Sequence, residues 1–463
     1  MTHSSARTAG DPPADPRPGA LPALPEASAA DTARVLALAV GPIVAQGVIA
    51  RRRRVVALAG RFDTDARGVR ALQVVRDRYG PGPVRLRVPG RRVAVVLDPQ
   101  DVATVLEGAP EPFAPANREK RGALRHFQPH GVLVSSGQAR AQRRTVNEAV
   151  LDTGHPLHEN AAAITHVVRQ EAAALRAAAV DSGVLDWDAF MRAWWRVVRR
   201  VVLGDGARDD DALTDDLTRL RRAGNWSGLH PRNRHVRERM RQRLAAHLGR
   251  AEPGSLAAVM ARTPVPPGTD AVDQVPQWLF AFDPAGAVAL RALALVAAHP
   301  GFARCVRDDL AERDATRPQE LPLLRAAVLE SARLWPTTPL LLRDTVSETR
   351  WARGALPAGT ALLIPTWYLH RNDARPDAHR FSPDGWLDGT YDADPAIVPF
   401  SAGPAHCPGR ELVLLTASTM LATLVGDLDL TVRPAGLLVP GRPLPGGLDP
   451  FTLRFAVRGR ADA

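Results

Sequence analysis

Cysteine is scarce in this sequence, with only Cys305 and Cys407 in 463 residues. Two distant cysteines cannot build a disulfide scaffold, and a structural zinc site needs more ligands of this kind. Low cysteine usage suits a reducing compartment, so we expect a cytoplasmic protein. The chain also has no G-x-y repeat, although it contains 41 prolines and 36 glycines, which excludes a collagen-like fibre.

No secretory signal is visible in the sequence, and we expect no transmembrane span. Residues 1–33 are rich in Pro, Ala, Ser and Asp without an apolar stretch behind a basic start, so we expect a disordered tail. Val35–Ala50 is apolar and is followed by the basic run Arg51–Arg54, which imitates a membrane anchor. This segment is too short to cross a bilayer and is interrupted by Gly41-Pro42. We therefore predict an amphipathic surface helix, with a membrane-dipping helix as the alternative.

The remaining composition is that of a globular protein. The chain has 45% hydrophobic and 24% charged residues, which leaves ample apolar material for a large core. Its formal net charge of +11 raises the question of nucleic acid or an acidic partner. Nearly all the cations are arginines spread over many segments. Either an arginine-biased composition or a basic docking face for an acidic protein accounts for this pattern.

Helical periodicity dominates the chain after one predicted hairpin, Val84–Val88 and Val93–Leu97. With no internal repeat and no compositional linker, residues 34–463 are predicted to form a single, mainly α domain. The predicted helices are Gln138–Leu151, His158–Ala178, Trp187–Leu203, Asp210–Arg222, His235–Leu248, Ala271–Ala298, Pro300–Glu312, Leu321–Leu334 and Cys407–Leu424. Short strands are predicted within Arg343–Pro365, at Leu428–Val432 and at Phe451–Val457.

The most informative segment is Pro399–Glu411, which reads PFSAGPAHCPGRE and precedes an apolar helical run. It places Cys407 after a Gly- and Pro-rich loop and at a predicted helix start. Backbone N–H groups and the positive end of the helix dipole favour a thiolate there. From these residues alone, Cys407 is a nucleophile, a buried core residue or a metal ligand.

Phe400, Gly403, Cys407 and Gly409 form the pattern F-x-x-G-x-x-x-C-x-G at fixed spacing. This segment resembles the cysteine-ligand loop of the cytochrome P450 family. The resemblance implies that the Cys407 thiolate binds the iron of haem b, with Phe400 and Gly403 in the loop that holds the cofactor. It also implies the cytochrome P450 fold, a large helical domain with small peripheral β-sheets.

A second match lies upstream, where Glu330 and Arg333 form E-x-x-R on one helix face and can pair. Such pairs are common, but Leu334-Trp335-Pro336 and then Arg343 follow this one, in the order of the family's K helix and next strand. The resemblance implies a structural pair beneath the haem loop and a propionate-binding role for Arg343. Gly385 stands where many members carry an arginine that completes the pair. We expect the pair to find its third partner elsewhere or to lack one.

A third match is the basic helix after Gly137, in which Arg140 and Arg144 lie four residues apart on one face. This spacing is similar to the family's arrangement for contacting the haem propionates. Arg140 replaces the usual aromatic residue or histidine, and it either reaches the same propionate or faces solvent. Ala405 replaces the usual cation two residues before the cysteine. His406 either takes over that role or packs within the loop.

In the central helix, Phe280–Pro284 falls where the family carries A/G-G-x-D/E-T. The acid is retained as Asp283, and Pro284 replaces the threonine. Because proline lacks an N–H and clashes with the preceding turn, we expect a kink here. We expect Asp283 to relay protons, with an acid paired to a nearby arginine as the alternative. Without a hydroxyl at Pro284, oxygen activation has to use ordered water, a substrate hydroxyl or preformed hydrogen peroxide.

These matches predict a haem-thiolate monooxygenase that inserts one oxygen atom from O2 into a small, mainly apolar organic substrate, in secondary metabolism. The alternatives are a peroxide-driven peroxygenase and an oxygen-independent isomerase or dehydratase. Phe280, Phe282 and Leu340–Leu342 are expected to line an apolar pocket. We expect a monomer that binds no nucleic acid.

Electrons are expected to come from a ferredoxin and its ferredoxin reductase, because no reductase domain or flavin motif occurs in the sequence. Arg140, Arg143, Arg144 and Arg410 are expected to form part of a basic face on which an acidic ferredoxin docks.

Overall fold

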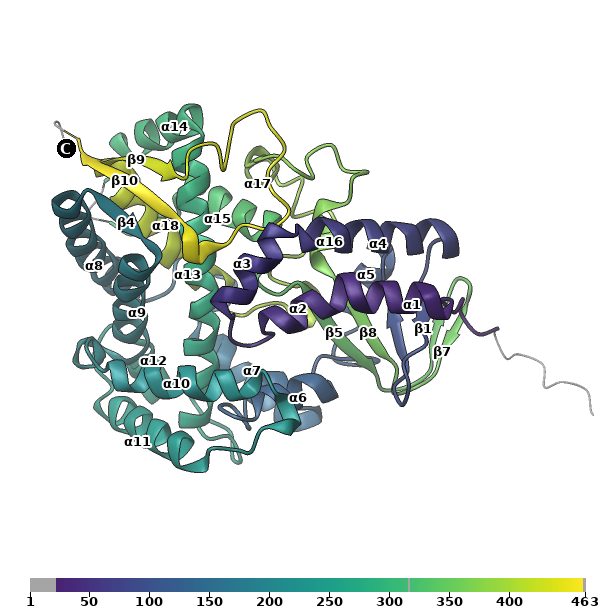
Figure 1. The fold of residues 1–463 in the computed structure, drawn as a ribbon. Helices are drawn as coiled ribbons and strands as arrows, with labels where there is room; N and C mark the ends of the chain where they lie inside the picture. The colour runs from purple at the N-terminus through teal and green to yellow at the C-terminus, as the bar shows by residue number, and fades with distance from the viewer. Residues whose placement is uncertain (1–21, 315–316, 461–463) are drawn as a thin grey trace, which may run out of the picture.

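An apolar helix of 24 residues, α13 (Val275–Ala298), runs through the middle of the molecule, and the long helices pack around it (Figure 1). The computed structural model of the protein describes residues 22–314 and 317–460. By length and composition, residues 272–298 could cross a membrane, but 67% of the window is buried within the protein. This burial is typical of a core helix, because a helix that is apolar on every face needs neighbours on every face.

The helical region contains all of the long helices predicted from periodicity, together with the short α12. The helix α9 has the predicted bounds, because the Asp186 side chain caps its first turn and Gly204, with φ of 100°, ends it. The helices of this region are α7 (Gly137–Val150), α8 (Ala161–Ser182), α9 (Trp187–Leu203), α10 (Asp211–Gly224), α11 (Arg234–Arg250), α12 (Leu256–Arg262), α14 (Pro300–Ala311), α15 (Pro322–Leu334) and α18 (Arg410–Asp427).

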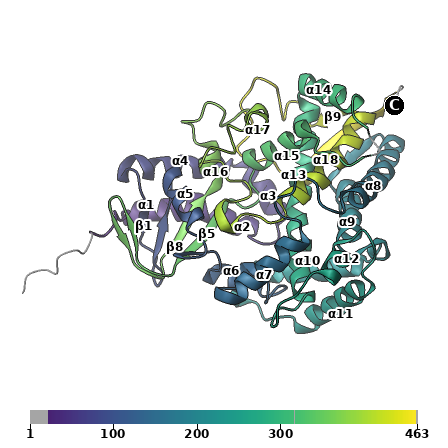
Figure 2. The same ribbon diagram turned by 180° about the vertical axis from the view of Figure 1, so that it is seen from behind.

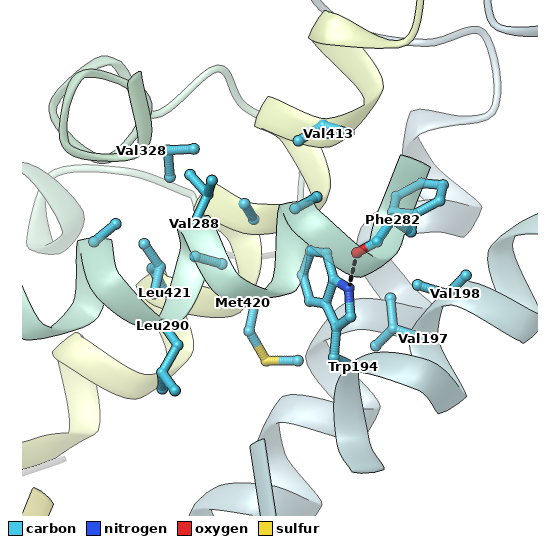
Figure 3. Close-up of a cluster of buried hydrophobic side chains, with 14 of the residues drawn as sticks. Trp194, Val197, Val198, Phe282, Val288, Leu290, Val328, Val413, Met420 and Leu421 are labelled. Carbon is cyan, nitrogen blue, oxygen red and sulfur yellow. Dashed lines mark hydrogen bonds between the residues drawn. The ribbon is translucent and has the colours of Figure 1, made fainter. Parts of the chain in front are cut away.

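The main core lies where α9, α13, α15 and α18 meet (Figure 3). Trp194 of α9 is fully buried there and donates its indole N–H to the carbonyl of Phe282 on α13, at 2.8 Å. Side chains from the four helices make up this core, and they include Val197, Val198, Val288, Leu290, Val328, Val413, Met420 and Leu421.

A second core surrounds a five-stranded sheet at the other end of the molecule, away from α8–α12 (Figure 2). Its strand order is β1-β2-β8-β5-β3, and only the β2–β8 pair is parallel. The predicted hairpin is confirmed as β1 and β2. These strands are β1 (Val84–Leu86), β2 (Val93–Val95), β3 (Phe113–Ala114), β5 (Leu340–Thr345) and β8 (Ala361–Pro365).

Two small sheets and several shorter helices complete the described part of the chain. The sheets are β4 (Val184–Asp186) with β10 (Arg454–Gly459) and β9 (Leu428–Arg433), and β6 (Thr349–Trp351) with β7 (Gly354–Leu356). The shorter α-helices are α1 (Ala29–Val35), α2 (Gly41–Gln46), α3 (Arg53–Arg61), α4 (Thr64–Tyr79), α5 (Pro99–Glu107), α6 (Arg118–Leu124), α16 (Thr366–Arg371) and α17 (Asp384–Leu387). The 3₁₀ turns are η2 (Val132–Val134), η3 (Asp205–Ala207), η4 (Ser227–Leu229), η5 (Val272–Gln274), η6 (Gly403–Ala405) and η7 (Pro450–Thr452).

The fold begins earlier than predicted, because residues 22–33 are ordered in the structure and are not part of a tail. Leu24 and Ala27 are buried, and the chain forms bridges with β7 and β1. The buried carboxylate of Asp31 accepts hydrogen bonds from the Tyr79 hydroxyl at 2.8 Å and from Arg78 at 2.6 Å, which fastens this segment to α4. Residues 1–21 of the predicted tail lie outside the described residues.

The apolar segment at residues 35–50 is helical and lies on the surface, as predicted, but it is divided into shorter pieces. A π-helical turn, η1 (Leu36–Val40), separates α1 from α2, and α2 begins at Gly41. Ala39 and Ile43 are buried beneath it, whereas Val44 and Val48 are exposed. The segment is therefore amphipathic, with one side packed on the protein.

Candidate active site

Cys407 lies in a tight loop just before α18. Its backbone N–H donates to the Phe400 carbonyl at 2.9 Å, and the Gly409 N–H donates to its sulfur. The helix begins at Arg410 with Gly409 as the N-cap, so Cys407 lies two residues ahead of the cap and not at the predicted helix start. Burial raises the pKa of the Cys407 thiol, although Gly409, Arg144 and Arg410 oppose it. Without a metal at the sulfur, the cost of burying the charge exceeds the effect of these neighbours.

The loop that carries Cys407 is pressed against the end of α5. Gly403 has a φ of 63°, and a Cβ there would lie 2.2 Å from the Leu106 carbonyl oxygen. Any other residue would therefore be excluded by both the backbone conformation and the lack of space. Ser401 also has a positive φ, of 62°, and its hydroxyl accepts a hydrogen bond from Arg343 at 3.2 Å. Phe400 is half-buried and packs against the helical core.

The predicted pair on α15 is fully buried and bidentate. The Arg333 Nε and Nη2 atoms donate to the two Glu330 carboxylate oxygens at 2.7 and 2.6 Å, and both side chains have no exposed area. Arg333 also donates to the carbonyls of His370, Asp377 and Arg380. A buried ion pair of this kind is stable only when its remaining donors and acceptors are satisfied, and here they are.

Other residues replace the arginine that the family places at position 385. The Ser382 backbone N–H donates to Glu330 at 2.7 Å, and the Trp386 indole N–H donates to the same carboxylate at 3.0 Å. The Tyr391 ring lies beside Gly385, so closely that a Cβ there would be 2.7 Å from it. The Arg333 guanidinium is 5.4 Å from the centre of this ring. The sequence therefore has glycine at this position because the tyrosine fills the space.

His370 links this buried pair to the segment that leads into the Cys407 loop. Its Nδ1 lies 3.1 Å from the Arg333 carbonyl, and its Nε2 accepts the Val398 N–H at 3.0 Å. Burial, reinforced by Arg333, lowers the pKa of His370 to about 3, so the imidazole is neutral. A neutral ring with Nδ1–H satisfies both hydrogen bonds.

A group of cationic side chains lies on the other side of the loop. Arg140, Arg144 and Arg343 are all buried, with 7%, 9% and 2% of their surface exposed. Arg144 donates to the His406 carbonyl at 2.8 Å and to Glu148 at 2.5 Å. Three of their buried nitrogens have no hydrogen-bond partner among the described residues, namely Arg140 Nε, Arg144 Nη2 and Arg343 Nε. Burial and the neighbouring Arg140 lower the pKa of Arg343 to about 10.

Burial changes two of the predicted roles of these arginines. Arg140 does not face solvent, and neither Arg140 nor Arg144 is available to a docking protein. Of the predicted basic face, only Arg143 and Arg410 are partly accessible. The His406 imidazole lies 2.9 Å from the Gly403 carbonyl through Nδ1, which favours the loop-packing role over propionate binding.

Sequence reasoning missed Lys120, which lies in the same group on α6. Its ammonium donates to the carbonyl of Pro115 at 2.9 Å and to that of Leu342, the residue before Arg343, at 3.0 Å. Burial and then the Arg343 charge hold the pKa of Lys120 well below its usual range. A signal was present in the sequence, because Lys120 is the only lysine in the chain.

Asp283 on α13 is paired with an arginine of α10. The Arg221 Nη2 lies 2.5 Å from the Asp283 carboxylate, and Arg221 also donates to the Ile49 carbonyl. The Arg221 guanidinium is 5.3 Å from the centre of the Phe280 ring. The alternative that we gave for Asp283, an acid paired with a nearby arginine, is therefore the arrangement in the structure.

The helix α13 continues through Pro284 without interruption. Since Pro284 has no N–H, the Phe280 carbonyl loses its donor within the helix. Gly286, two residues after Pro284, allows Trp194 to approach, because a Cβ there would lie 2.8 Å from the indole ring. Phe282 is buried in the core with Trp194, whereas we expected it to line an apolar pocket. Ala281 is exposed in the middle of this core helix, which indicates open space beside it.

The arrangement of helices and sheets is that of a known fold. The solved structure of retinoic acid bound cyanobacterial CYP120A1 matches 84% of this chain and 94% of that chain, with a TM-score of 0.69 at 17% sequence identity. The family model for cytochrome P450 matches residues 292–440, which include Glu330, Arg333 and Cys407. The chain therefore has the cytochrome P450 fold, and residues 292–440 resemble the cytochrome P450 family.

Similarity to curated cytochromes P450 is confined to part of the chain. Cyclooctat-9-en-7-ol 5-monooxygenase of Streptomyces melanosporofaciens is 34% identical over 159 residues, which are 32% of this chain and 33% of that protein. Sugiol synthase of Salvia miltiorrhiza is 37% identical over 152 residues, 31% of this chain and 30% of that protein. The chain thus spans about a third of the length of the curated relatives it matches.

A cytochrome P450 holds a haem whose iron is bound by a cysteine thiolate, and the residues of this chain fit that group. The Cys407 sulfur is held by the loop and accepts a hydrogen bond from the backbone N–H of Gly409. Iron deprotonates a coordinating thiol, which offsets the raised pKa of Cys407. The partnerless nitrogens of Arg140, Arg144 and Arg343 are suited to the two anionic propionates.

Proposed function

We propose that this protein is a cytoplasmic, monomeric cytochrome P450 monooxygenase that inserts one oxygen atom from O2 into a small, mainly apolar organic substrate of secondary metabolism. Its cofactor is haem b, and its electrons come from a separate ferredoxin and ferredoxin reductase. The observation that carries the proposal is the Cys407 loop, which is connected through His370 to a fully satisfied ion pair and contacts Arg343. Arg343 and its neighbour Arg140 are buried cations without an ion pair among the described residues. Thiolate-bound haem supplies the O–O cleavage chemistry.

The chain's own residues hold the cofactor and exclude water. Glu330, Arg333 and His370 fix the approach to the loop, and Gly403 sets its distance from α5. Arg140, Arg144 and Arg343 bind the propionates. Preorganised contacts of this kind position a cofactor without reorganisation during turnover.

Proton delivery in this chain starts from Asp283 and uses water or a substrate hydroxyl. Pro284 has neither a hydroxyl nor a backbone N–H, so it cannot donate a hydrogen bond. Asp283 keeps about a third of its side chain exposed while it is paired with the buried Arg221. It can therefore orient water on the accessible side of the carboxylate. Asp283→Asn, with unchanged turnover and unchanged coupling of electron use to product, would exclude this role.

We infer that the substrate pocket lies beside Ala281, which is exposed although it belongs to a core helix. Phe280 and Leu340–Leu342 are half-buried. These side chains provide an apolar lining, which favours a mainly hydrocarbon substrate. The relatives named cyclooctat-9-en-7-ol 5-monooxygenase and 1,25-dihydroxyvitamin D(3) 24-hydroxylase, the latter from Rattus norvegicus and 32% identical over 153 residues, support a small organic substrate.

The test is a spectral titration of the haem-loaded protein with fatty acids, terpenoids, polyketides and aromatic compounds. A shift of the ferric haem from low to high spin identifies the substrate class, and labelled O2 then has to appear in the product when reduced ferredoxin is supplied. Turnover is expected to weaken with rising salt if docking is electrostatic. A chain that takes up no haem, or a product without the label, would contradict the proposal.

A peroxide-driven reaction is a second candidate, and the Arg221–Asp283 pair favours it. An unpaired Asp283 would repel the carboxylate of an acidic substrate. Arg221 lies 2.5 Å from Asp283 and offsets its negative charge, so this objection to a peroxide-driven reaction on acidic substrates no longer holds. Hydrogen peroxide alone, without ferredoxin, is the discriminating reagent. Product formation at a rate equal to or above that with reduced ferredoxin supports this candidate, and the absence of product excludes it. An oxygen-independent isomerase or dehydratase would turn over without either oxidant.

A further inference from the structure

Lys120 stands out because every other cationic side chain among the 60 Lys and Arg residues is an arginine. A general demand for positive charge does not explain a single lysine, since arginine supplies charge everywhere else in the chain. The two residues differ in shape: lysine has a compact ammonium with three donors, whereas arginine has a planar fork. Position 120 is therefore a place where the geometry of an ammonium matters.

The structure shows what surrounds this ammonium. Asn117 caps α6 and accepts the Lys120 backbone N–H at 2.9 Å, which fixes the start of the helix. The Lys120 side chain then donates to the carbonyls of Pro115 and Leu342. Two of its three N–H groups are thus used by neutral acceptors, and one remains for a further acceptor.

The acidic residues near Lys120 are already engaged. Asp344 and Glu119 both form ion pairs with Arg91. Neither Lys120 nor its neighbours Arg140 and Arg343 form an ion pair with any residue in 22–314 or 317–460. Buried cations without counter-ions are costly, so this volume is suited to an anion with several oxygen acceptors.

We propose that Lys120 binds a haem propionate, and that this contact makes haem insertion order the segment 113–133. The inference rests on the proposed function, because it requires haem at Cys407. The segment includes α6, which packs against η2, η4 and the end of α10. Anchoring Lys120 would therefore fix a segment whose Phe127 ring lies 5.3 Å from the ring of Phe280 on α13.

The first test compares haem with its dimethyl ester, in which both propionates are uncharged. The variant is Lys120→Met, and the matched control is Arg121→Met, which removes an exposed cation from the same helix. For each protein, the rates at which haem and its dimethyl ester are released into apomyoglobin are measured. The ratio of the two rates gives the preference of that protein for haem. We expect Lys120→Met to reduce this preference by about tenfold or more, which is the contribution of one charge-assisted hydrogen bond, and Arg121→Met to leave it unchanged. An unchanged preference in Lys120→Met overturns the inference.

The second test uses the fact that acylating reagents find only Lys120 and the N-terminal amine in this chain. Mass spectrometry of wild-type protein loaded with haem or with the ester measures the acylation rate of Lys120, with the N-terminal amine as internal reference. We expect acylation to be about tenfold slower in the haem-loaded protein. Equal rates overturn the inference. This measurement does not require a variant to fold.

Hydrogen exchange of residues 113–133 tests the ordering. Haem is expected to slow exchange in wild type and in Arg121→Met more than in Lys120→Met, and equal slowing in all three contradicts the second part of the inference. Lys120→Gln, which keeps donors for the two carbonyls, replaces Lys120→Met if the latter does not fold. A wild-type chain that gives no thiolate-haem spectrum overturns the proposed function itself. An intact spectrum with an unchanged ester preference overturns only the role of Lys120.

Discussion

Two buried polar regions contact the Cys407 loop, and they differ in how well their groups are satisfied. In the region of Glu330 and Arg333, the carboxylate and the guanidinium are bonded to each other, to backbone groups and to Trp386. In the region of Arg140 and Arg343, buried nitrogens lack partners among the described residues. The polypeptide completes the first region by itself, whereas the second needs an anion from outside. The first is therefore part of the fold, and the second has the properties expected of the binding site that we propose.

The largest effect is expected when Arg333→Met disrupts the fully hydrogen-bonded region of Glu330 and Arg333. Glu330 is then left as a buried charge without its cation, so we expect a loss of about 3–5 kcal/mol in the free energy of unfolding. Urea denaturation followed by circular dichroism measures it, with the exposed Arg121→Met as the control. A loss below about 1 kcal/mol would show that Ser382 and Trp386 can hold the carboxylate alone.

His370 contacts the region of Glu330 and Arg333, and it predicts that the free energy of unfolding depends on pH. Its pKa is lowered to about 3 in the folded protein, compared with about 6.5 when unfolded. The unfolded chain therefore binds the extra proton first, so the stabilising contribution is complete above pH 6.5 and is lost as the pH falls towards 3. The slope due to this residue approaches about 1.4 kcal/mol per pH unit below pH 6.5.

The measurement is the free energy of unfolding between pH 7 and pH 4.5 in wild type and in His370→Gln. We expect the wild-type curve to fall more steeply than that of the variant. Parallel curves would show that His370 is protonated in the folded protein or accessible to water.

A smaller change sharpens the role of Tyr391 as a substitute for the missing arginine. Gly385→Ala places a Cβ 2.7 Å from the Tyr391 ring, so we expect a loss of about 1–3 kcal/mol from overpacking. Combining it with Tyr391→Ala removes the clash, and the double-mutant cycle should show a coupling energy of the opposite sign. Additive losses would place the cost of Gly385→Ala in the backbone of α17.

The smallest effect, and the one that separates the two regions, is expected for Arg343→Met. Its cation repels Arg140 and has no carboxylate among the described residues, so the apoprotein should lose no stability. The haem-loaded protein should release haem about tenfold faster, because one charged contact is lost. Apoprotein stability by denaturation and haem release by transfer to apomyoglobin give the two values. A loss in both would make Arg343 a structural residue like Arg333.

Local signals accounted for most of the fold. The bounds of α9 and the β1–β2 hairpin follow from apolar spacing, an Asp cap and turn residues, all of which act within a few residues. The order of residues 22–33 depends on contacts with α4 and β7, which no local pattern reveals. The Cys407 loop was recognisable because four residues recur at fixed spacing.

The partners within the site were harder to predict. Asp283 pairs with Arg221, which is 62 residues away on a different helix. Trp386 and Tyr391, which complete the buried pair, come from an irregular stretch without periodicity. The raised pKa of Cys407 depends on desolvation, a property of the packed loop that the sequence of the loop does not contain. Sequence motifs therefore identified Cys407 and Asp283. Tertiary packing determines the pKa of Cys407 and the partner of Asp283.

The unsatisfied cations around Arg343 also place a demand on the cell that produces the protein. Without an anion, Lys120, Arg140 and Arg343 repel one another in a region of low polarity, which favours local opening of the chain. Proteases cleave such open states and thereby remove newly made polypeptide. The yield of intact protein should then follow the rate at which the cell synthesises porphyrin, so supply of the cofactor and survival of the chain are coupled from translation onward.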